Sequence, residues 1–171
     1  CTPWMLGERC PVSSTTTRAT LFNISMVHTR EHLMRAVYEG IGYNLRWILE
    51  NYSRDYGFSC DNFRIIGGGA LDDTWMHIIA DITGKCFSVV KDPRNAGAVG
   101  AAVVALIGLG ELPGFSAAKD FVQVERCYEP DPKNRRVYDH LFENYKRVYN
   151  SLKEVFYDLS IHMFLHNFYN K

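Results

Sequence analysis

Three consecutive glycines, followed by an acidic pair, form the part of the sequence that is best suited to bind a ligand. The glycines, 67–69, follow the apolar segment 62–66 and precede the acidic pair Asp72 and Asp73. Glycine has no Cβ, so it can adopt positive φ and lets a ligand approach the backbone closely. The start of the following helix offers unpaired amide groups and a partial positive charge, both of which suit a phosphate. The pattern favours a turn that contacts a phosphate or a nucleotide.

A tight structural turn is the competing interpretation of the same residues. The glycines do not form the six-residue dinucleotide fingerprint, and no Walker lysine follows them. Either Asp72 or Asp73 can cap the next helix, which would explain an acidic residue there without any ligand. A nucleotide-binding role therefore needs support from other parts of the sequence.

Histidines and cysteines predict neither a metal site nor a nucleophile. His28 and His32 have helical spacing, as do His162 and His166, but no HExxH pattern is present and the second pair is flanked by large apolar residues that favour packing. The five cysteines are widely scattered: Cys1, Cys10, Cys60, Cys86 and Cys127. Without zinc-knuckle or redox spacing, we expect them to be reduced thiols.

Composition excludes several classes of protein. The 171 residues suit one domain, and 19 basic residues balance 19 acidic ones. The chain therefore has no net positive charge that would favour binding to nucleic acid or to an anionic membrane surface. No apolar run reaches the roughly 20 residues that span a bilayer, and no signal peptide is visible. These observations predict a cytoplasmic protein without nucleic-acid or membrane partners, and they leave homodimer formation open.

The elements that must position the glycine turn alternate between strands and helices. Strands are expected at residues 19–24, 62–66, 85–90 and 121–124. Helices are expected after Thr29, after the acidic pair and up to Gly84, from 95 through a run of very small residues, and from 134 into the aromatic tail. Because strands alternate with helices, we predict an α/β fold in which a sheet is flanked by helices.

Apolar spacing indicates which helix faces are buried. In the first helix the apolar stripe comprises Leu33, Val37, Ile41, Leu45 and Ile48. Glu39 lies in the same helix, where a salt-bridged helix position is favoured over a role facing a cleft. Small side chains predict that the helix beginning at 95 packs tightly against a neighbour. Tyr138 and Tyr145 in the last helix are expected in the core or at an interdomain contact.

The glycine turn and its helix carry a resemblance to a known family. Residues 67–70, Gly-Gly-Gly-Ala, followed by Trp75 and by Ala-Asp-Ile-Thr-Gly at 80–84, resemble the adenosine motif of the FGGY carbohydrate kinases. The small residues at 97–103 resemble the connecting helix of that family. The resemblance thus identifies the turn with a nucleotide-contacting segment.

Two upstream motifs extend the resemblance at consistent spacing. Residues 19–24, a seven-residue spacer and residues 32–39 are similar to the second signature of the family. Residues 7–11, Gly-Glu-Arg-Cys-Pro, resemble a stretch typical of the xylulose kinase branch. Four ordered motifs are more specific than any one of them, and together they cover about residues 3–110.

The resemblance implies an actin-like ATPase (ribonuclease H-like) fold with a long carboxy-terminal helix. The implied nucleotide-binding residues are Gly67, Gly68, Gly69, Ala70 and Asp73. The first two would shape the turn and the other three would contact the nucleotide. Asp73 stands where some members have Asn, so its carboxylate could accept from a ribose hydroxyl or an adenine amine but would repel phosphate. Capping of the helix is the alternative role.

The resemblance also implies a function for residues 1–171. They would form the carboxy-terminal, nucleotide-binding half of a two-domain kinase that uses ATP and magnesium to phosphorylate a sugar or polyol, with xylulose or a related ketopentose expected. The catalytic carboxylate and most sugar contacts of the family precede the region matched here, so no catalytic residue is assigned and the fragment alone is expected to be inactive.

Two rival interpretations stay open. Val12, Ser14, Ala19 and Asn23 stand where the xylulose branch usually has His, Asp and two glycines. These departures favour a nucleotide-sensing or scaffolding module of the same fold that has lost the chemistry. In the second rival, the glycine turn is purely structural and the long helix makes the functional contacts.

Overall fold

A computed structural model describes the backbone of residues 1–169 and the side chains of residues 1–161. The chain divides into two compact units. One consists of Cys1–Ser59 with Lys133–Lys171, and the other of Cys60–Pro132. The glycine turn lies in the second unit. The pair His162 and His166 lies outside the residues whose side chains the structure describes.

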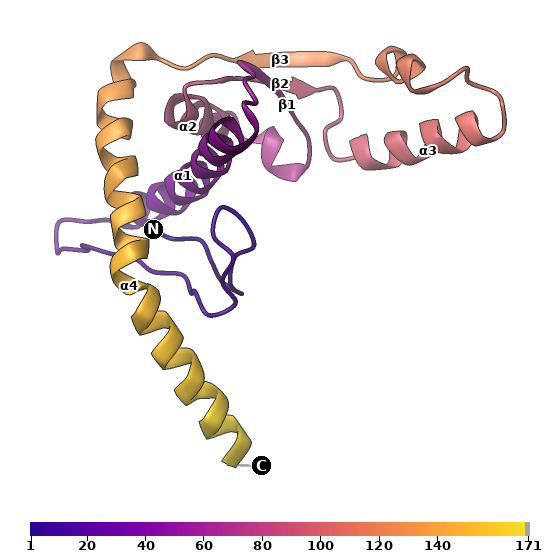
Figure 1. Ribbon diagram of the computed structural model, residues 1–171. Coiled ribbons are helices and arrows are strands. Elements are labelled where there is room, and N and C mark those ends of the chain that lie inside the picture. The colour runs from indigo at the N-terminus through magenta and orange to yellow at the C-terminus, as the bar shows by residue number, and fades with distance from the viewer. Residues whose placement is uncertain (170–171) are drawn as a thin grey trace. The chain divides into compact units, whose positions relative to one another are not determined.

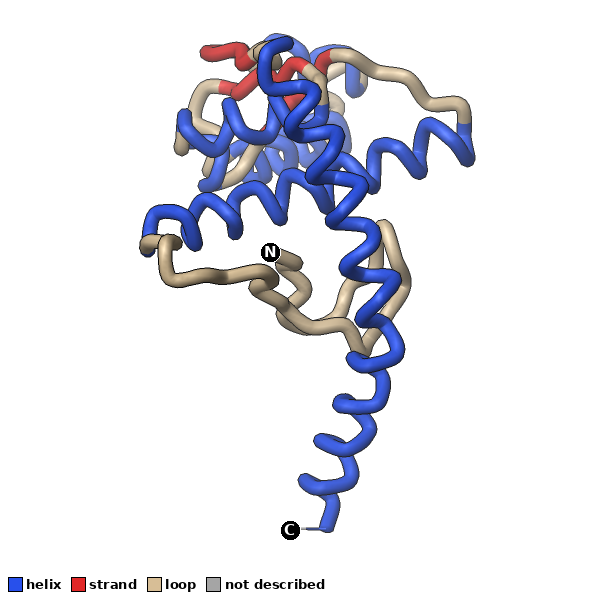
Figure 2. Tube along the Cα trace, turned by 90° about the vertical axis from the view of Figure 1, so that its left-hand side faces the viewer, coloured by secondary structure: helices blue, strands red, loops and turns tan. Residues whose placement is uncertain are grey.

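The unit Cys60–Pro132 is built around a small mixed sheet (Figures 1 and 2). Strand β1 (Asn62–Ile65) pairs in parallel with β2 (Cys86–Val90), and β3 (Val124–Tyr128) pairs with β2 antiparallel at the edge. The first two strands confirm the sequence prediction. The strand predicted at 121–124 lies too early in the sequence. Phe121 follows a 3₁₀ turn, η2 (Phe115–Asp120), and β3 begins only at Val124.

Helix α2 (Asp73–Thr83) connects the two parallel strands. Its N-cap is Asp72, whose Oδ1 accepts from the amide of Trp75 at 3.0 Å, and Gly84 ends it with φ 68°. The predicted capping and termination are therefore confirmed. Ile78, Ile79 and Ile82 are buried on the inner face of α2, with Met76 beside them. This helix and the strands form the core beneath the glycine turn.

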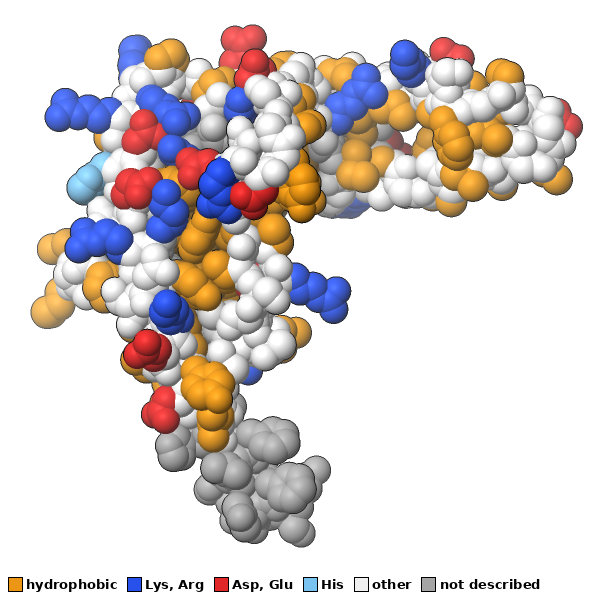
Figure 3. Space-filling view, in the orientation of Figure 1, with side chains coloured by type: hydrophobic (Ala, Val, Ile, Leu, Met, Phe, Trp, Pro, Cys, Tyr) orange, Lys and Arg blue, Asp and Glu red, His pale blue; other side chains and the backbone are white. Residues whose placement is uncertain are grey.

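Helix α3 (Ala96–Gly108) is more exposed than its small residues predicted. Val103 is its one fully buried residue, and a Cβ built on Gly97 or Gly100 would meet nothing within 4 Å. The expectation of tight packing was wrong for the described chain, because no neighbouring backbone lies against these glycines. Figure 3 shows apolar side chains at the surface of this segment.

The first unit pairs α1 (Arg30–Tyr56) with α4 (Arg135–Tyr169), which confirms the predicted long carboxy-terminal helix. Thr29 caps α1 as expected. The strand predicted over 19–24 was wrong, because backbone pairing there is limited to two hydrogen bonds between Thr2 and Thr20, of 2.9 and 3.3 Å.

The core of this unit is aromatic. It includes Trp4, Tyr43, Phe142 and Tyr145, all at most 6% exposed. Arg46 is also buried, and its guanidinium lies over the Phe142 ring at 4.4 Å. A sheet flanked by helices, together with the long last helix, confirms the predicted α/β class.

The buried face of α1 differs from the predicted stripe. Its buried residues are Gly40, Gly42, Tyr43 and Arg46, whereas the predicted aliphatic residues are all only partly buried. A Cβ on Gly40 would lie 2.4 Å from the carbonyl oxygen of Cys1, so the glycine allows the amino-terminal segment to approach the helix. Small residues therefore mark the closest contact, which aliphatic periodicity does not detect.

Candidate nucleotide-binding site

The glycine turn is held in place by backbone hydrogen bonds. Gly67 adopts φ 99°, which side chains disfavour, and its amide donates to the carbonyl of Pro93 at 2.7 Å. The chain then forms one 3₁₀ turn, η1 (Gly68–Leu71), in which the amide of Ala70 donates to Gly67 O at 3.2 Å. These contacts fix the path of the backbone between β1 and α2.

The three glycines face different surroundings. A Cβ on Gly68 would meet nothing within 4 Å, and the residue is exposed, so a ligand can approach its backbone. A Cβ on Gly69 would lie 2.2 Å from Cζ3 of Trp75, which shows that the indole ring occupies that side of the turn. Gly68 therefore presents the open surface, and Gly69 is required for packing.

Ala70 turns its side chain into the protein. It is 1% exposed, so its methyl group belongs to the core below the turn. A ligand above the turn cannot reach that methyl group. The predicted nucleotide contact of Ala70 therefore stays a prediction about its backbone rather than its side chain.

Asp73 is engaged by two residues that sequence reasoning missed. Its carboxylate accepts hydrogen bonds from the Arg126 guanidinium and the Tyr128 hydroxyl, both on β3. Burial and the bond to Asp73 raise the pKa of Tyr128, which keeps the phenol protonated as the donor. The carboxylate is 66% exposed, so its remaining surface can still accept from a ligand. No sequence motif pairs these residues, because the pairing depends on the register of β3.

The adjacent aspartates thus have separate roles. Asp72, not Asp73, accepts from the first turn of α2, so capping is not the function of Asp73. Asp73 instead ties the start of α2 to the edge strand. Its predicted nucleotide contact stays a prediction, and any such contact shares the carboxylate with Arg126 and Tyr128.

The loop before α3 lies beside the turn. Pro93, which accepts from Gly67, lies between Asp92 and Asn95. Asp92 adopts φ 52°, and its carboxylate accepts from the Asn95 side chain at 2.7 Å. The start of the small-residue helix α3 is therefore close to the glycine turn, although the two motifs are well separated in the sequence.

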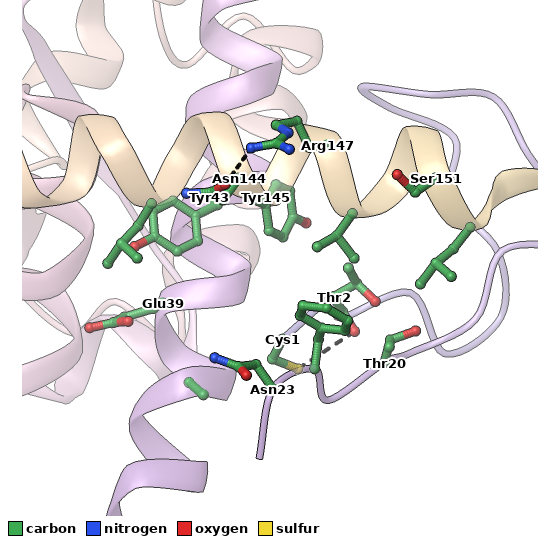
Figure 4. Close-up of a pocket in the computed structure, with 15 residues that line it drawn as sticks. Cys1, Thr2, Thr20, Asn23, Glu39, Tyr43, Asn144, Tyr145, Arg147 and Ser151 are labelled. Atoms are coloured by element: carbon green, nitrogen blue, oxygen red, sulfur yellow. Dashed lines mark hydrogen bonds between the residues drawn. The ribbon is translucent and has the colours of Figure 1, made fainter. Parts of the chain in front are cut away.

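A separate cavity of about 560 Å³ lies within the first unit. Figure 4 shows the labelled side chains around it, which come from α1 (Glu39, Tyr43), from α4 (Asn144, Tyr145, Arg147, Ser151) and from the amino-terminal segment (Cys1, Thr2, Thr20, Asn23). The Glu39 carboxylate accepts from Arg35 Nε at 2.8 Å and from the Tyr138 hydroxyl at 3.3 Å. The predicted salt-bridged role of Glu39 is thereby confirmed, although the residue also lines the cavity.

His28 and His32 are held by local contacts. The Nδ1 atom of His28 accepts from the amide of Ser25 at 2.9 Å, and that of His32 accepts from the amide of Thr29 at 3.1 Å. Among the side chains that the structure describes, no three His, Cys, Asp or Glu residues are grouped to hold a metal ion. None of the described helices is long and apolar enough to cross a bilayer.

The fold and the turn define a class of protein when compared with known structures. The chain is similar to a ligand-bound xylulose kinase from Lactobacillus acidophilus, with 25% identity and a TM-score of 0.81 over 92% of this chain and 32% of that one. It is also similar to a xylulose kinase from Rhodospirillum rubrum, with 32% identity and a TM-score of 0.76 over 92% of this chain and 31% of that one. The fold is thus the expected actin-like ATPase fold.

The sequence comparison assigns the family. Residues 1–109 match the model of the FGGY family of carbohydrate kinases, C-terminal domain, and the chain belongs to this family. It is 34% identical to the xylulose kinase of Bacillus subtilis (strain 168) over 90% of this chain and 31% of that relative. The chain therefore spans about a third of the length of the relatives it matches.

Proposed function

We propose that this chain is the nucleotide-binding part of an ATP-dependent carbohydrate kinase. Membership of the FGGY family supports the class of activity. The observation that carries the proposal is the open backbone at Gly68, in a turn fixed by the bond from Gly67 to Pro93. A nucleotide would lie above Gly68, and the exposed surface of the Asp73 carboxylate would accept from a ribose hydroxyl or an adenine amine.

ATP supplies the phosphoryl group, and magnesium would accompany its phosphates. The described side chains include no group of three metal ligands, so we propose that the ion is held mainly by the nucleotide and by other parts of the whole protein. The contribution of this chain is to bind and orient the nucleotide. Phosphoryl transfer and sugar binding would need the additional length that the relatives have, so this chain alone is expected to be inactive.

The proposed acceptor is xylulose or a related ketopentose. The similarity to proteins named xylulose kinase supports this choice. The alternative is a nucleotide-binding module of the same fold without kinase activity, which the departures at Val12, Ser14, Ala19 and Asn23 favour. If the whole protein bound ADP but phosphorylated no ketopentose or other sugar, the alternative would replace the kinase proposal.

Calorimetric titration of the chain with ADP and magnesium tests the proposed nucleotide site. Gly68→Val places a branched side chain in the open space above the turn and should weaken ADP binding about tenfold or more, which corresponds to about 1.4 kcal/mol. Gly108→Val is the matched control, because a Cβ there also meets nothing within 4 Å. Equal affinities for both variants would place the nucleotide elsewhere.

A further inference from the structure

Two cysteines from different strands lie on the same face of the sheet. Cys127 of β3 is directly opposite Ser88 of β2, and their side chains approach to 3.8 Å between Oγ and Sγ. Cys86 precedes Ser88 by two residues, so its side chain points to the same face. The two thiols are therefore diagonal neighbours, although 41 positions separate them in the sequence.

The two thiols are close enough to interact with each other, and Cys127 is the more accessible of the two. The Cys127 side chain forms a hydrogen bond with the Cys86 thiol and, together with partial burial, raises the pKa of Cys86 to about 11. Cys127 is exposed and Cys86 is partly buried, so a small oxidant reaches Cys127 first. Cys60, in the same unit, instead donates to the carbonyl of Asn62 at 3.0 Å.

We propose that Cys86 and Cys127 form an oxidisable pair that closes to a disulfide between β2 and β3. The oxidant is a peroxide. The Cys127 thiolate attacks one peroxide oxygen, giving a sulfenic acid and releasing one water after proton transfer. The sulfur of the Cys86 thiol then attacks the sulfenic sulfur and the S–S bond forms. The sulfenic hydroxyl group leaves with the proton of the Cys86 thiol as a second water. Two thiols lose two electrons in total, and one peroxide is reduced to two waters.

Closure of the bond acts on the candidate site through β3. Diagonal neighbours on adjacent strands lie farther apart than directly opposite residues, so bond formation draws the edge strand toward β2. Cys127 is flanked by Arg126 and Tyr128, the two residues that hold the Asp73 carboxylate on the other face. Oxidation therefore displaces the Asp73 tether, by which we mean the hydrogen bonds from Arg126 and Tyr128 to the Asp73 carboxylate at the start of α2. The disulfide itself does not depend on the proposed kinase function.

The test is peptide mapping of the chain after treatment with hydrogen peroxide. All five cysteines are free thiols, so closure should lower the thiol count from five to three, with the 86–127 disulfide as the product and a thiol reductant restoring five. In Cys86→Ser and Cys127→Ser the bridge should be lost, whereas Cys60→Ser should retain it. Circular dichroism verifies that each variant is folded, and Cys86→Ala replaces Cys86→Ser if the serine variant is not.

Two results would overturn the proposal. One is a folded wild-type chain in which peroxide produces over-oxidised Cys127 without a disulfide. The other is a bridge that maps to a different pair of cysteines. A third measurement tests the consequence: in the oxidised chain, the amides of Asp73 and Trp75 should shift in the NMR spectrum, and no shift there would refute the link to the Asp73 tether.

Discussion

At the scale of residues, the glycine turn separates a packing role from a ligand-facing role. Gly69 is required because the Trp75 ring occupies its Cβ side, whereas Gly68 faces open space. Sequence alone gives both positions the same residue type. Their difference follows from the way α2 places an aromatic side chain back over the turn.

Substitution of each glycine by alanine should reveal this difference. Gly69→Ala should lower the free energy of unfolding by about 1–3 kcal/mol, because its methyl group overlaps the indole ring. Gly68→Ala should change it by less than about 1 kcal/mol in either direction. Urea denaturation monitored by circular dichroism measures both. Equal losses in the two variants would contradict the assignment of Trp75 as the constraint.

Asn23 shows what residue identity predicts and what it does not. Asn23 stands at a position where the xylulose branch usually has a glycine. The structure places it at φ 61°, a conformation that Asn tolerates better than most non-glycine residues. An asparagine therefore occupies this left-handed position without the need for a glycine. By contrast, the hydrogen bonds from Arg126 and Tyr128 to Asp73 could not be predicted. They depend on the register of β3, and the sequence prediction placed that strand at residues 121–124 rather than from Val124 onward.

At the scale of elements, the ends of helices were predicted better than their environment. Capping by Thr29 and Asp72 and termination at Gly84 depend on local backbone groups, which neighbouring residues determine. Burial depends on what the rest of the chain brings to each face. The small residues of α3 predicted close packing, yet the described chain leaves Gly97 and Gly100 uncovered.

The exposure of α3 gives the second prediction. Gly100→Ala should raise the stability of the helix by about 0.5–1 kcal/mol, because alanine is the better helix former and its methyl group meets no neighbour. The free energy of local opening, from amide hydrogen exchange across 96–108, measures the effect. Faster exchange in the variant would mean that another backbone packs against this glycine.

The contact between α1 and α4 includes an ion pair that responds to acid. Arg46 Nη2 lies 2.7 Å from Asp139 Oδ1, and Arg135 Nε lies 2.9 Å from the same atom. Partial burial raises the pKa of Asp139, but hydrogen bonds from Arg46 and Arg135 outweigh it, so the net pKa lies below the ordinary value. Folding therefore favours the ionised form of this carboxyl group.

The sign of the pH dependence follows from that lowered pKa. The stabilisation is present above the ordinary pKa of an aspartate, about 3.9, and is lost as the pH falls through the lower folded-state pKa. Denaturation of wild type and Asp139→Asn between about pH 6 and pH 2 should give a shallower acid-induced loss for the variant. The surface substitution Asp120→Asn is the control, and identical curves for wild type and Asp139→Asn would exclude this contribution.

At the scale of the whole molecule, the α/β class could be predicted from the alternation of strands and helices. The family could be predicted because four short motifs occur in order and at consistent spacing. The cavity between α1, α4 and the amino-terminal segment could not be predicted, because its lining comes from three distant stretches of sequence. Proteins similar to this chain are about three times as long, since it covers 31% of the Bacillus subtilis relative. That difference in length supports the proposal that this chain binds the nucleotide, whereas phosphoryl transfer and sugar binding need the additional length that the relatives have.

The most direct test of the central proposal is an amide chemical-shift titration of the chain with ADP and magnesium. The proposal predicts shifts concentrated at Gly67–Asp73, even at millimolar affinity, with the tether residues Arg126 and Tyr128 moving through their bonds to Asp73. Residues in the α1–α4 unit, such as Tyr43, should stay unchanged. If saturating nucleotide moved no amide of the turn in this chain or in the full-length protein, the nucleotide-binding proposal would be wrong.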